Sequence, residues 1–192
     1  MNFTNEIFKI IFFARAGQGA KSIAEVLAQS LVSEGKFAQA FSFYGPQRSG
    51  APTKTYLKIS DKPIRNHEPI VDPDAVVVLD DTLLESEKVG RNLTEDEVLI
   101  VNTRKTEEEI RKIVGNFKGN IKIIDAYQVA MDIIGQGHIN TVLLGKIIQV
   151  MEIVKLDTAK KEFKKVFGKK LEKNILKNNL LAIEKGYDDY NL

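Results

Sequence analysis

The segment Ile7-Phe8-Lys9-Ile10-Ile11-Phe12-Phe13-Ala14-Arg15-Ala16-Gly17-Gln18-Gly19-Ala20-Lys21-Ser22 decides the fold of this chain. It begins with an apolar run that is typical of a buried strand and continues into two glycines separated by one residue. A helical pattern follows, with Ile23, Val26, Leu27 and Leu31 spaced to lie on one face. A strand, a glycine loop and a helix in this order predict an anion-binding turn, because free N–H groups and the helix dipole attract a phosphate.

Length and composition limit the class of protein. The chain has 192 residues, enough for one hydrophobic core, and we expect residues 1–192 to form a single domain. Its formal net charge of +2 gives no tendency toward nucleic acid or anionic membranes. The absence of cysteine excludes disulfides and cysteine-ligated iron–sulfur clusters. The first apolar run is too short for a secretory signal, and Glu6 stands where a positive charge is needed, so we expect a cytoplasmic protein.

Short apolar runs alternate with helical patterns along the first two thirds of the chain. Further strands are expected at residues 37–43, 53–59, 75–79, 98–101 and 121–124, with a helix at 106–114. Residues 53–59 alternate as in a half-buried strand. The order predicts a Rossmann-like α/β fold, with a mostly parallel sheet flanked by helices, over about residues 1–139. From about 140 to 192 the pattern predicts a helical C-terminal part.

A second loop, Tyr44-Gly45-Pro46-Gln47-Arg48-Ser49-Gly50-Ala51-Pro52, follows the second expected strand. Its glycines and prolines predict a rigid segment with an arginine at its centre. In open parallel sheets, ligands collect outside the carboxyl ends of the strands. If the first two strands are parallel neighbours, Arg15 and Arg48 approach each other and can clamp a diphosphate. A tight strand–helix turn and a rigid connection with a solvated arginine are the simpler interpretations of the two loops.

Asp80, Asn102 and Asp125 also follow apolar strands and are therefore expected at the same edge. Carboxylates there could perform acid–base chemistry, but Asp and Asn in this position more often cap the next helix. The lysine-rich segment 155–177 is expected to be either a solvated helix surface or a docking surface for an acidic partner. No Walker motif or catalytic triad is recognisable, so we expect no catalytic residue in this chain. With no cysteine and only His67 and His138, far apart in the sequence, we expect no metal ligand either.

The two loops, in this order and separation, resemble those of the gamma subunit of 2-oxoacid:ferredoxin oxidoreductases, of the pyruvate/ketoisovalerate type. The glycine-rich first motif of that family is matched by Gly17-Gln18-Gly19, although Ala14 and Ala16 stand where glycines are common. The second motif bears an arginine and ends in Gly50-Ala51-Pro52. Other matching segments are Glu34-Gly35-Lys36, Gln39-Ala40-Phe41, Ser60-Asp61-Lys62-Pro63-Ile64, Asp72-Pro73-Asp74, Asn140-Thr141, Leu144-Gly145 and Gly186-Tyr187.

The resemblance implies a subunit of a multi-subunit enzyme of anaerobic metabolism that decarboxylates a 2-oxoacid on thiamine diphosphate. Electrons pass through iron–sulfur clusters to ferredoxin or flavodoxin, and the acyl group passes to coenzyme A. Pyruvate is the first candidate 2-oxoacid and 2-oxoglutarate the second. The thiamine diphosphate and the clusters are expected on alpha, beta and delta-type partner subunits, so this chain should be inactive alone; isolated, it could form a homodimer.

The resemblance places part of the coenzyme A site on the two loops. Its expected residues are Arg15, Gly17, Gln18, Gly19, Lys21, Ser22, Tyr44, Gly45, Arg48 and Gly50. No nucleic acid or membrane partner is expected. Two alternatives remain, a stand-alone Rossmann-type nucleotide-binding oxidoreductase and a purely structural interface subunit of the same complex. Against the first, Ser22 replaces the third glycine of the dinucleotide pattern.

Overall fold

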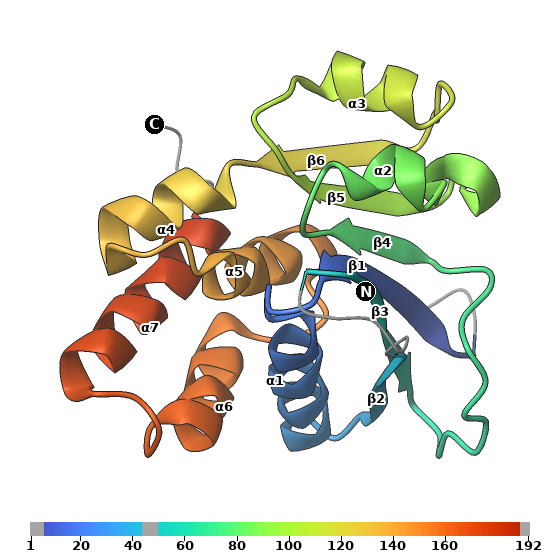
Figure 1. Ribbon diagram of the computed structural model, residues 1–192. Coiled ribbons are helices and arrows are strands. Elements are labelled where there is room, and N and C mark those ends of the chain that lie inside the picture. The colour runs from blue at the N-terminus through green and yellow to red at the C-terminus, as the bar shows by residue number, and fades with distance from the viewer. Residues whose placement is uncertain (1–5, 44–49, 189–192) are drawn as a thin grey trace.

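The computed structural model describes residues 6–43 and 50–188, whose centre is a six-stranded sheet with the order β2-β3-β1-β4-β5-β6 (Figure 1). Strands β1, β4, β5 and β6 are parallel, and β3 is antiparallel to both of its neighbours. The fold is therefore the expected α/β class, with a mixed sheet. The strands are β1 (Phe8–Arg15), β2 (Phe37–Phe43), β3 (Pro52–Ser60), β4 (Ala75–Val78), β5 (Val98–Asn102) and β6 (Asn120–Ile124).

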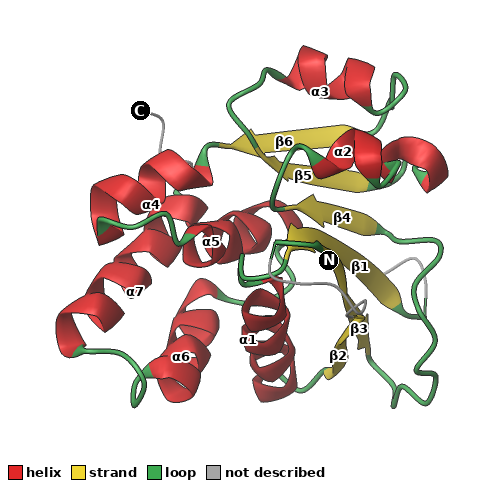
Figure 2. Cartoon of the chain, viewed as in Figure 1, coloured by secondary structure: helices red, strands yellow, loops and turns green. Residues whose placement is uncertain are grey.

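Helices cover both faces of this sheet (Figure 2). On one face lie α1 (Ala20–Ser33), α4 (Ala126–Ile134), α5 (Ile139–Met151), α6 (Leu156–Phe167) and α7 (Lys173–Tyr187). On the other face lie α2 (Leu83–Ser86), the 3₁₀ turn η1 (Val89–Asn92) and α3 (Glu107–Ile113). The C-terminal helices share one apolar core with α1 and the sheet, because α5 and α7 pack against each other and α6 packs on α1.

The alternation of side chains in β1 explains why the sheet is covered twice. Ile10 and Phe12 point into the core under α1 and α5, and Ile11 and Phe13 point into the core under α2 and α3. All four are buried, as are all the residues of β4. Burial on both faces is what the continuous apolar runs of these strands predict.

The relation between the first two strands differs from the expectation. β1 and β2 are not neighbours, because β3 returns from the second loop and inserts between them as an antiparallel strand. The condition that the first two strands are neighbours is therefore not met, but the strands are parallel to each other and both end at the same edge of the sheet. The start of β3 pairs with the end of β1, Arg15 opposite Pro52, so the two loops meet there.

Two other local predictions can be compared with the structure. In β3, Leu57 and Ile59 are buried on one face as expected, but Tyr56 and Lys58 on the other face are buried as well. Lys58 Nζ reaches the carbonyl of Asn66 at 3.0 Å, so the segment after β3 folds over this face. The predicted helix after β5 is confirmed as α3, and it begins with a capping box between Thr106 and Glu109.

The two central parallel strands send the chain to opposite faces. β1 continues into α1 on one face, whereas the neighbouring β4 continues into α2 on the other. A sheet of this kind opens at its carboxyl edge between such strands, because the two connections diverge. The candidate site lies there.

Candidate functional site at the carboxyl edge of the sheet

The turn between β1 and α1 depends on its glycines. Gly17 has φ +103° and Gly19 has φ +85°, both in the left-handed region that side chains with a Cβ rarely adopt. The Gln18 amide donates to the Arg15 carbonyl at 3.0 Å, and the Arg15 amide donates back to Gln18 Oε1 at 2.8 Å. The glycines and Gln18 therefore fix the tight turn that aims the start of α1 at the edge of the sheet.

The end of the second loop forms one rim of this turn. The Ala16 amide donates to the Ala51 carbonyl at 2.9 Å, and the Gly50 amide donates to the Ala16 carbonyl at 3.3 Å. Gly50 has φ +86°, so a glycine is required there too. Tyr44, Gly45 and Arg48 lie outside the described residues, and the proposed approach of Arg48 to Arg15 stays a prediction.

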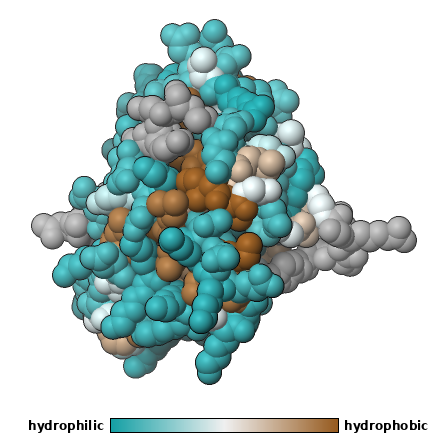
Figure 3. Space-filling view, turned by 90° about the vertical axis from the view of Figure 1, so that its left-hand side faces the viewer, coloured by the Kyte–Doolittle hydropathy of each residue, from teal (hydrophilic) through white to brown (hydrophobic). Residues whose placement is uncertain are grey.

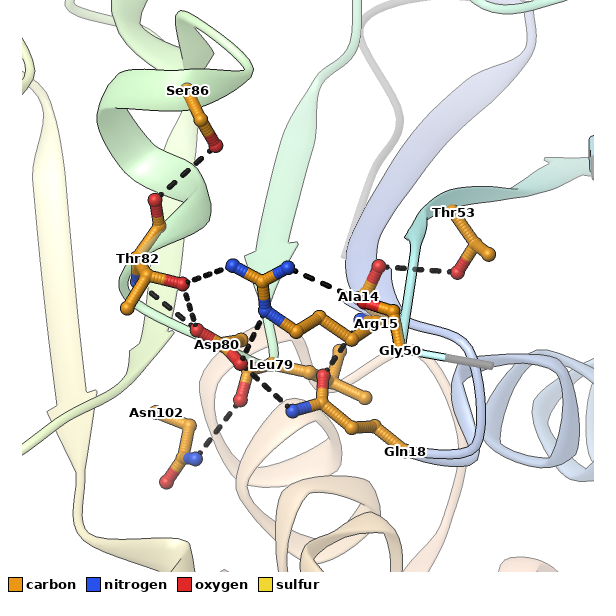
Figure 4. Close-up of polar contacts among 10 residues, drawn as sticks. All are labelled: Ala14, Arg15, Gln18, Gly50, Thr53, Leu79, Asp80, Thr82, Ser86 and Asn102. Carbon is orange, nitrogen blue, oxygen red and sulfur yellow. Dashed lines mark hydrogen bonds and ion pairs between the residues drawn. The ribbon is translucent and has the colours of Figure 1, made fainter. Parts of the chain in front are cut away.

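Arg15 is held by a network that sequence reasoning did not assign to it (Figure 4). Its Nε donates to Asp80 Oδ2 at 3.1 Å, its Nη2 to Thr82 Oγ1 at 2.7 Å and its Nη1 to the Gly50 carbonyl at 3.3 Å. Gln18 Nε2 also donates to Asp80 Oδ2, at 3.1 Å. The guanidinium thus ties the loops after β1, β2 and β4 together and presents a fixed charge at the rim.

Asp80 is an acceptor at the centre of this network. Burial by itself would raise the pKa of its carboxyl, but hydrogen bonds from Thr82 and Gln18, with the charge of Arg15, outweigh burial and hold that pKa below its usual 3.8. The group is therefore ionised at neutral pH and unsuited to donate a proton. Its arrangement points to positioning of Arg15 rather than to acid–base catalysis.

Replacing Asp80 with asparagine should lower the free energy of unfolding at pH 7 by about 1–2 kcal/mol, because charge-assisted hydrogen bonds are lost. Since the pKa of Asp80 is lower in the folded chain, the ionised carboxylate stabilises the fold above about pH 4, and this stabilisation is lost as the pH falls through the folded pKa. Urea unfolding should therefore give a smaller difference at about pH 3 than at pH 7. Asp96→Asn, at an exposed position, is the control, and an equal loss at both pH values would contradict a role of the charge.

A cleft of about 760 Å³ opens beside this network at the carboxyl ends of the parallel strands. One wall is the start of α1, and the other walls are the connections after β4, β5 and β6 and the turn before α5. Of the expected residues, Gly17, Gln18, Gly19 and Ser22 line the cleft, whereas Lys21 lies along a groove between α1 and β2. The other lining residues are Leu79, Asp80, Asp81, Asn102, Thr103, Arg104, Asp125, Tyr127, Gly137, His138, Ile139 and Asn140.

Asn102 and Asp125 both line this cleft and both cap the helix that follows β6. The Ala126 amide donates to Asn102 Oδ1 at 2.9 Å, and the Gln128 amide donates to Asp125 Oδ1 at 3.0 Å. Asn102 Nδ2 also donates to the Leu79 carbonyl at 3.0 Å, which links β5 to β4. The capping interpretation is confirmed for Asp125, the N-cap of α4. Asn102 does not cap the helix that follows it, because Thr106 caps α3, and it binds the first amide of α4 instead.

Three carboxylates of the cleft are each paired with a cation. Besides Arg15 with Asp80, Arg104 Nε lies 2.7 Å from Asp125 Oδ2, and Lys105 forms an ion pair with Asp81. Asp81, Arg104 and Lys105 were not among the expected site residues, although they directly follow the strand ends that were singled out. The cleft is therefore polar and close to neutral. The Arg104 guanidinium lies on its wall, whereas the expected residue Arg15 lies beside the cleft and reaches it through its partner Asp80.

Asn140 is another cleft residue that sequence reasoning did not place. A Cβ on Gly19 would lie 2.8 Å from Asn140 Cβ, so the start of α5 packs directly on the glycine turn. Within residues 6–43 and 50–188, no cluster of three or more His, Asp or Glu side chains could hold a metal ion. No described helix is both long enough and apolar enough to cross a bilayer.

Known proteins are similar to this chain in sequence and in fold. The family model described as pyruvate ferredoxin/flavodoxin oxidoreductase matches residues 9–189. The pyruvate synthase subunit PorC of Thermotoga maritima is 40% identical over 189 residues, which cover 98% of this chain and 97% of that protein. The pyruvate/ketoisovalerate oxidoreductases common subunit gamma of Thermococcus litoralis is 38% identical over 179 residues, which cover 93% of this chain and 97% of that protein.

A solved structure agrees with these sequence matches. The crystal structure of the pyruvate oxidoreductase subunit PORC from Thermotoga maritima superposes with a TM-score of 0.85 at 38% identity, over 96% of this chain and 97% of that chain. The resemblance inferred from the two loops is confirmed. The chain belongs to the pyruvate ferredoxin/flavodoxin oxidoreductase family, as a gamma-type subunit of such a complex.

Proposed function

We propose that this chain binds part of coenzyme A in the cleft at the carboxyl edge, while the complex decarboxylates a 2-oxoacid oxidatively to acyl-CoA and CO2. The observation that carries the proposal is the open start of α1. Its N-cap is Gly19, which supplies no capping side chain, and the amide of Ile23 is bonded back to the Gly19 carbonyl at 3.1 Å. The N–H groups of the first turn have no partner within the helix, and Gly19 and Ser22 at this end of α1 line the cleft, where phosphate oxygens can accept from such groups.

The charges of the cleft walls support an anionic ligand. Coenzyme A carries a diphosphate and a 3′-phosphate, which guanidinium groups bind with paired hydrogen bonds. Arg15 is pre-positioned by Asp80 at the rim, and the Arg104 side chain on the other wall is 67% exposed. Because each wall carboxylate already pairs with a cation, the cleft does not present uncompensated negative charge to the phosphates.

The rest of the reaction belongs to other subunits in this proposal. With no cysteine, the chain cannot ligate an iron–sulfur cluster, so electron transfer to ferredoxin or flavodoxin and the thiamine diphosphate chemistry take place on alpha, beta and delta-type partners in the cytoplasm. Pyruvate is the proposed 2-oxoacid, in line with the names of the relatives, and 2-oxoglutarate is the second candidate. An apolar area on the side formed by α4 and α7 offers a surface for a partner subunit (Figure 3).

The test is kinetic and uses the assembled complex. Changing both Arg15 and Arg48 to alanine should raise the KM for coenzyme A by about 10-fold or more, because charge-assisted hydrogen bonds to phosphate are lost. The KM for the 2-oxoacid should stay the same. The matched control is Arg91→Ala, which removes an exposed guanidinium away from the cleft and should leave the KM for coenzyme A unchanged.

Two outcomes would overturn the proposal in favour of the alternatives. Unchanged coenzyme A kinetics in a normally assembled double variant would assign the loops to a structural interface. Tight binding of NAD by the isolated chain, measured by calorimetry beside coenzyme A, would instead support a stand-alone nucleotide-binding oxidoreductase.

A further inference from the structure

The two outer strands of the sheet, β6 and β2, differ in whether their residues discourage pairing with another chain. β6 carries Lys122, which is exposed, and such a lysine discourages pairing with another chain. β2 reads Phe37-Ala38-Gln39-Ala40-Phe41-Ser42-Phe43, with no charged residue and no proline. In the part of the chain that the structure describes, β2 pairs only with β3, so its second edge has no strand partner. β2 therefore lacks the residues that usually keep an edge strand from pairing with another chain.

Aromatic side chains add apolar surface along this strand. Phe37 is 43% exposed and Phe43 is 53% exposed, although both are large apolar residues. Phe41 stacks on Tyr56 of β3 with ring centroids 5.2 Å apart, and Phe43 meets the same ring edge-on at 5.9 Å. One face of β2 therefore continues an aromatic cluster of the sheet and leaves its outermost rings exposed to solvent.

We propose that β2 pairs with β2 of a second copy of this chain, antiparallel, about a two-fold axis through Ala40. In this register Phe37 lies opposite Phe43 of the second copy, and Gln39 lies opposite Phe41 of the second copy, on the aromatic face. Each exposed ring then gains an aromatic partner, a stabilising cross-strand pair. On the helix face only small side chains, those of Ala38, Ala40 and Ser42, meet one another.

The sequence of β2 favours a second copy as the occupant because it is complementary to itself. A strand that bears a charge would need the opposite charge on its partner, whereas this strand has none to match. A groove of about 400 Å³ between α1 and β2, lined in part by Ala24, Ala28 and Ala40, gives the second copy additional concave surface beside the strand. The interface is separate from the cleft, so the inference does not depend on coenzyme A binding.

Residue 40 gives a direct test, since it faces its own copy across the axis. In sedimentation equilibrium of the full-length chain at about 1 to 100 µM, the wild type should be dimeric. Ala40→Lys and Ala40→Glu should each raise the dimer dissociation constant by about 100-fold or more, because like charges meet at the axis. An equimolar mixture of the two variants should recover dimers, identified as heterodimers by native mass spectrometry.

A variant on the opposite edge strand controls for the added charge. Ile123→Lys, on the opposite edge strand, adds the same charge at an exposed apolar residue and should leave the dimer intact. Phe43→Ser, which replaces a half-exposed ring, should also weaken the dimer and serves if a residue 40 variant does not fold. A monomeric wild type at all these concentrations, a dimer insensitive to residues 40 and 43, or no heterodimer in the mixture would each overturn the proposal.

Discussion

Replacing Gly145 with alanine is expected to lower the free energy of unfolding by about 3 kcal/mol, because the added methyl group forces two packed helices apart. A Cβ at this position of α5 would lie 1.9 Å from the Ile183 carbonyl oxygen and 2.8 Å from the Tyr187 amide nitrogen, both in α7. These obstacles are backbone atoms and cannot move aside as a side chain can. Gly186 makes the reciprocal contact, since its Cβ would lie 2.0 Å from the Val142 carbonyl oxygen.

The sign of this effect distinguishes packing from helix propensity. Alanine in place of glycine inside a helix stabilises by about 1 kcal/mol when nothing else changes, so propensity predicts a more stable Gly145→Ala variant. Urea unfolding monitored by circular dichroism measures the difference. Lys177→Ala, at an exposed site on α7, should stay within about 0.5 kcal/mol of the wild type. A Gly145→Ala protein as stable as the wild type would mean that the two helices do not depend on this close contact.

The glycines at 145 and 186 illustrate what the sequence alone can and cannot reveal. Leu144-Gly145 and Gly186-Tyr187 were identified as motifs shared with the family, but their spacing of about forty residues carries no sign that they meet. Their purpose appears only when α5 and α7 are packed together. Helix propensity depends only on the local sequence, so it predicts that these glycines destabilise their helices. It misses the stability gained where the glycines allow α5 and α7 to pack closely, because that contact joins residues far apart in the sequence.

In the sheet, too, the strands could be predicted from local patterns, whereas their pairing could not. The buried strands could be predicted because apolar runs such as 75–79 record burial on both faces, and the first helix could be predicted from its apolar stripe. The insertion of β3 between β1 and β2 could not be predicted, because strand pairing depends on contacts between segments far apart in the sequence. α4 was not predicted, although Ala126, Val129, Ala130 and Ile134 form its buried stripe, because a helix of nine residues carries few repeats of the pattern.

At the candidate site, sequence reasoning found the strand ends but not the partners. Asp80, Asn102 and Asp125 could be placed at one edge because each follows an apolar strand. That Arg15 pairs with Asp80, and that Arg104 pairs with Asp125, depends on which loops become neighbours. The place of the candidate site could therefore be predicted from the strand ends, whereas its ion pairs depend on contacts that only the folded chain makes.

Gly19→Ala should disturb the cleft more than any other single methyl group added to the glycine turn. Gly19 and Gly17 both have left-handed backbones, so alanine at either position costs about 1–2 kcal/mol in backbone strain. Only at Gly19 does the new Cβ meet a neighbour, Asn140 Cβ at 2.8 Å, whereas the space around Gly17 is open within 4 Å. The expected loss of unfolding free energy is therefore about 2–4 kcal/mol for Gly19→Ala and about 1–2 kcal/mol for Gly17→Ala.

The difference between these matched variants isolates the contact between α1 and α5, because the backbone strain is common to both. To relieve the clash, the start of α1 must move away from the start of α5, and both segments line the cleft. In the assembled enzyme, Gly19→Ala should consequently raise the KM for coenzyme A by about 10-fold relative to Gly17→Ala, if the first turn of α1 binds the phosphates. Equal stability losses would show that Asn140 yields without cost, and equal KM values beside unequal stabilities would place the phosphates elsewhere than at the start of α1.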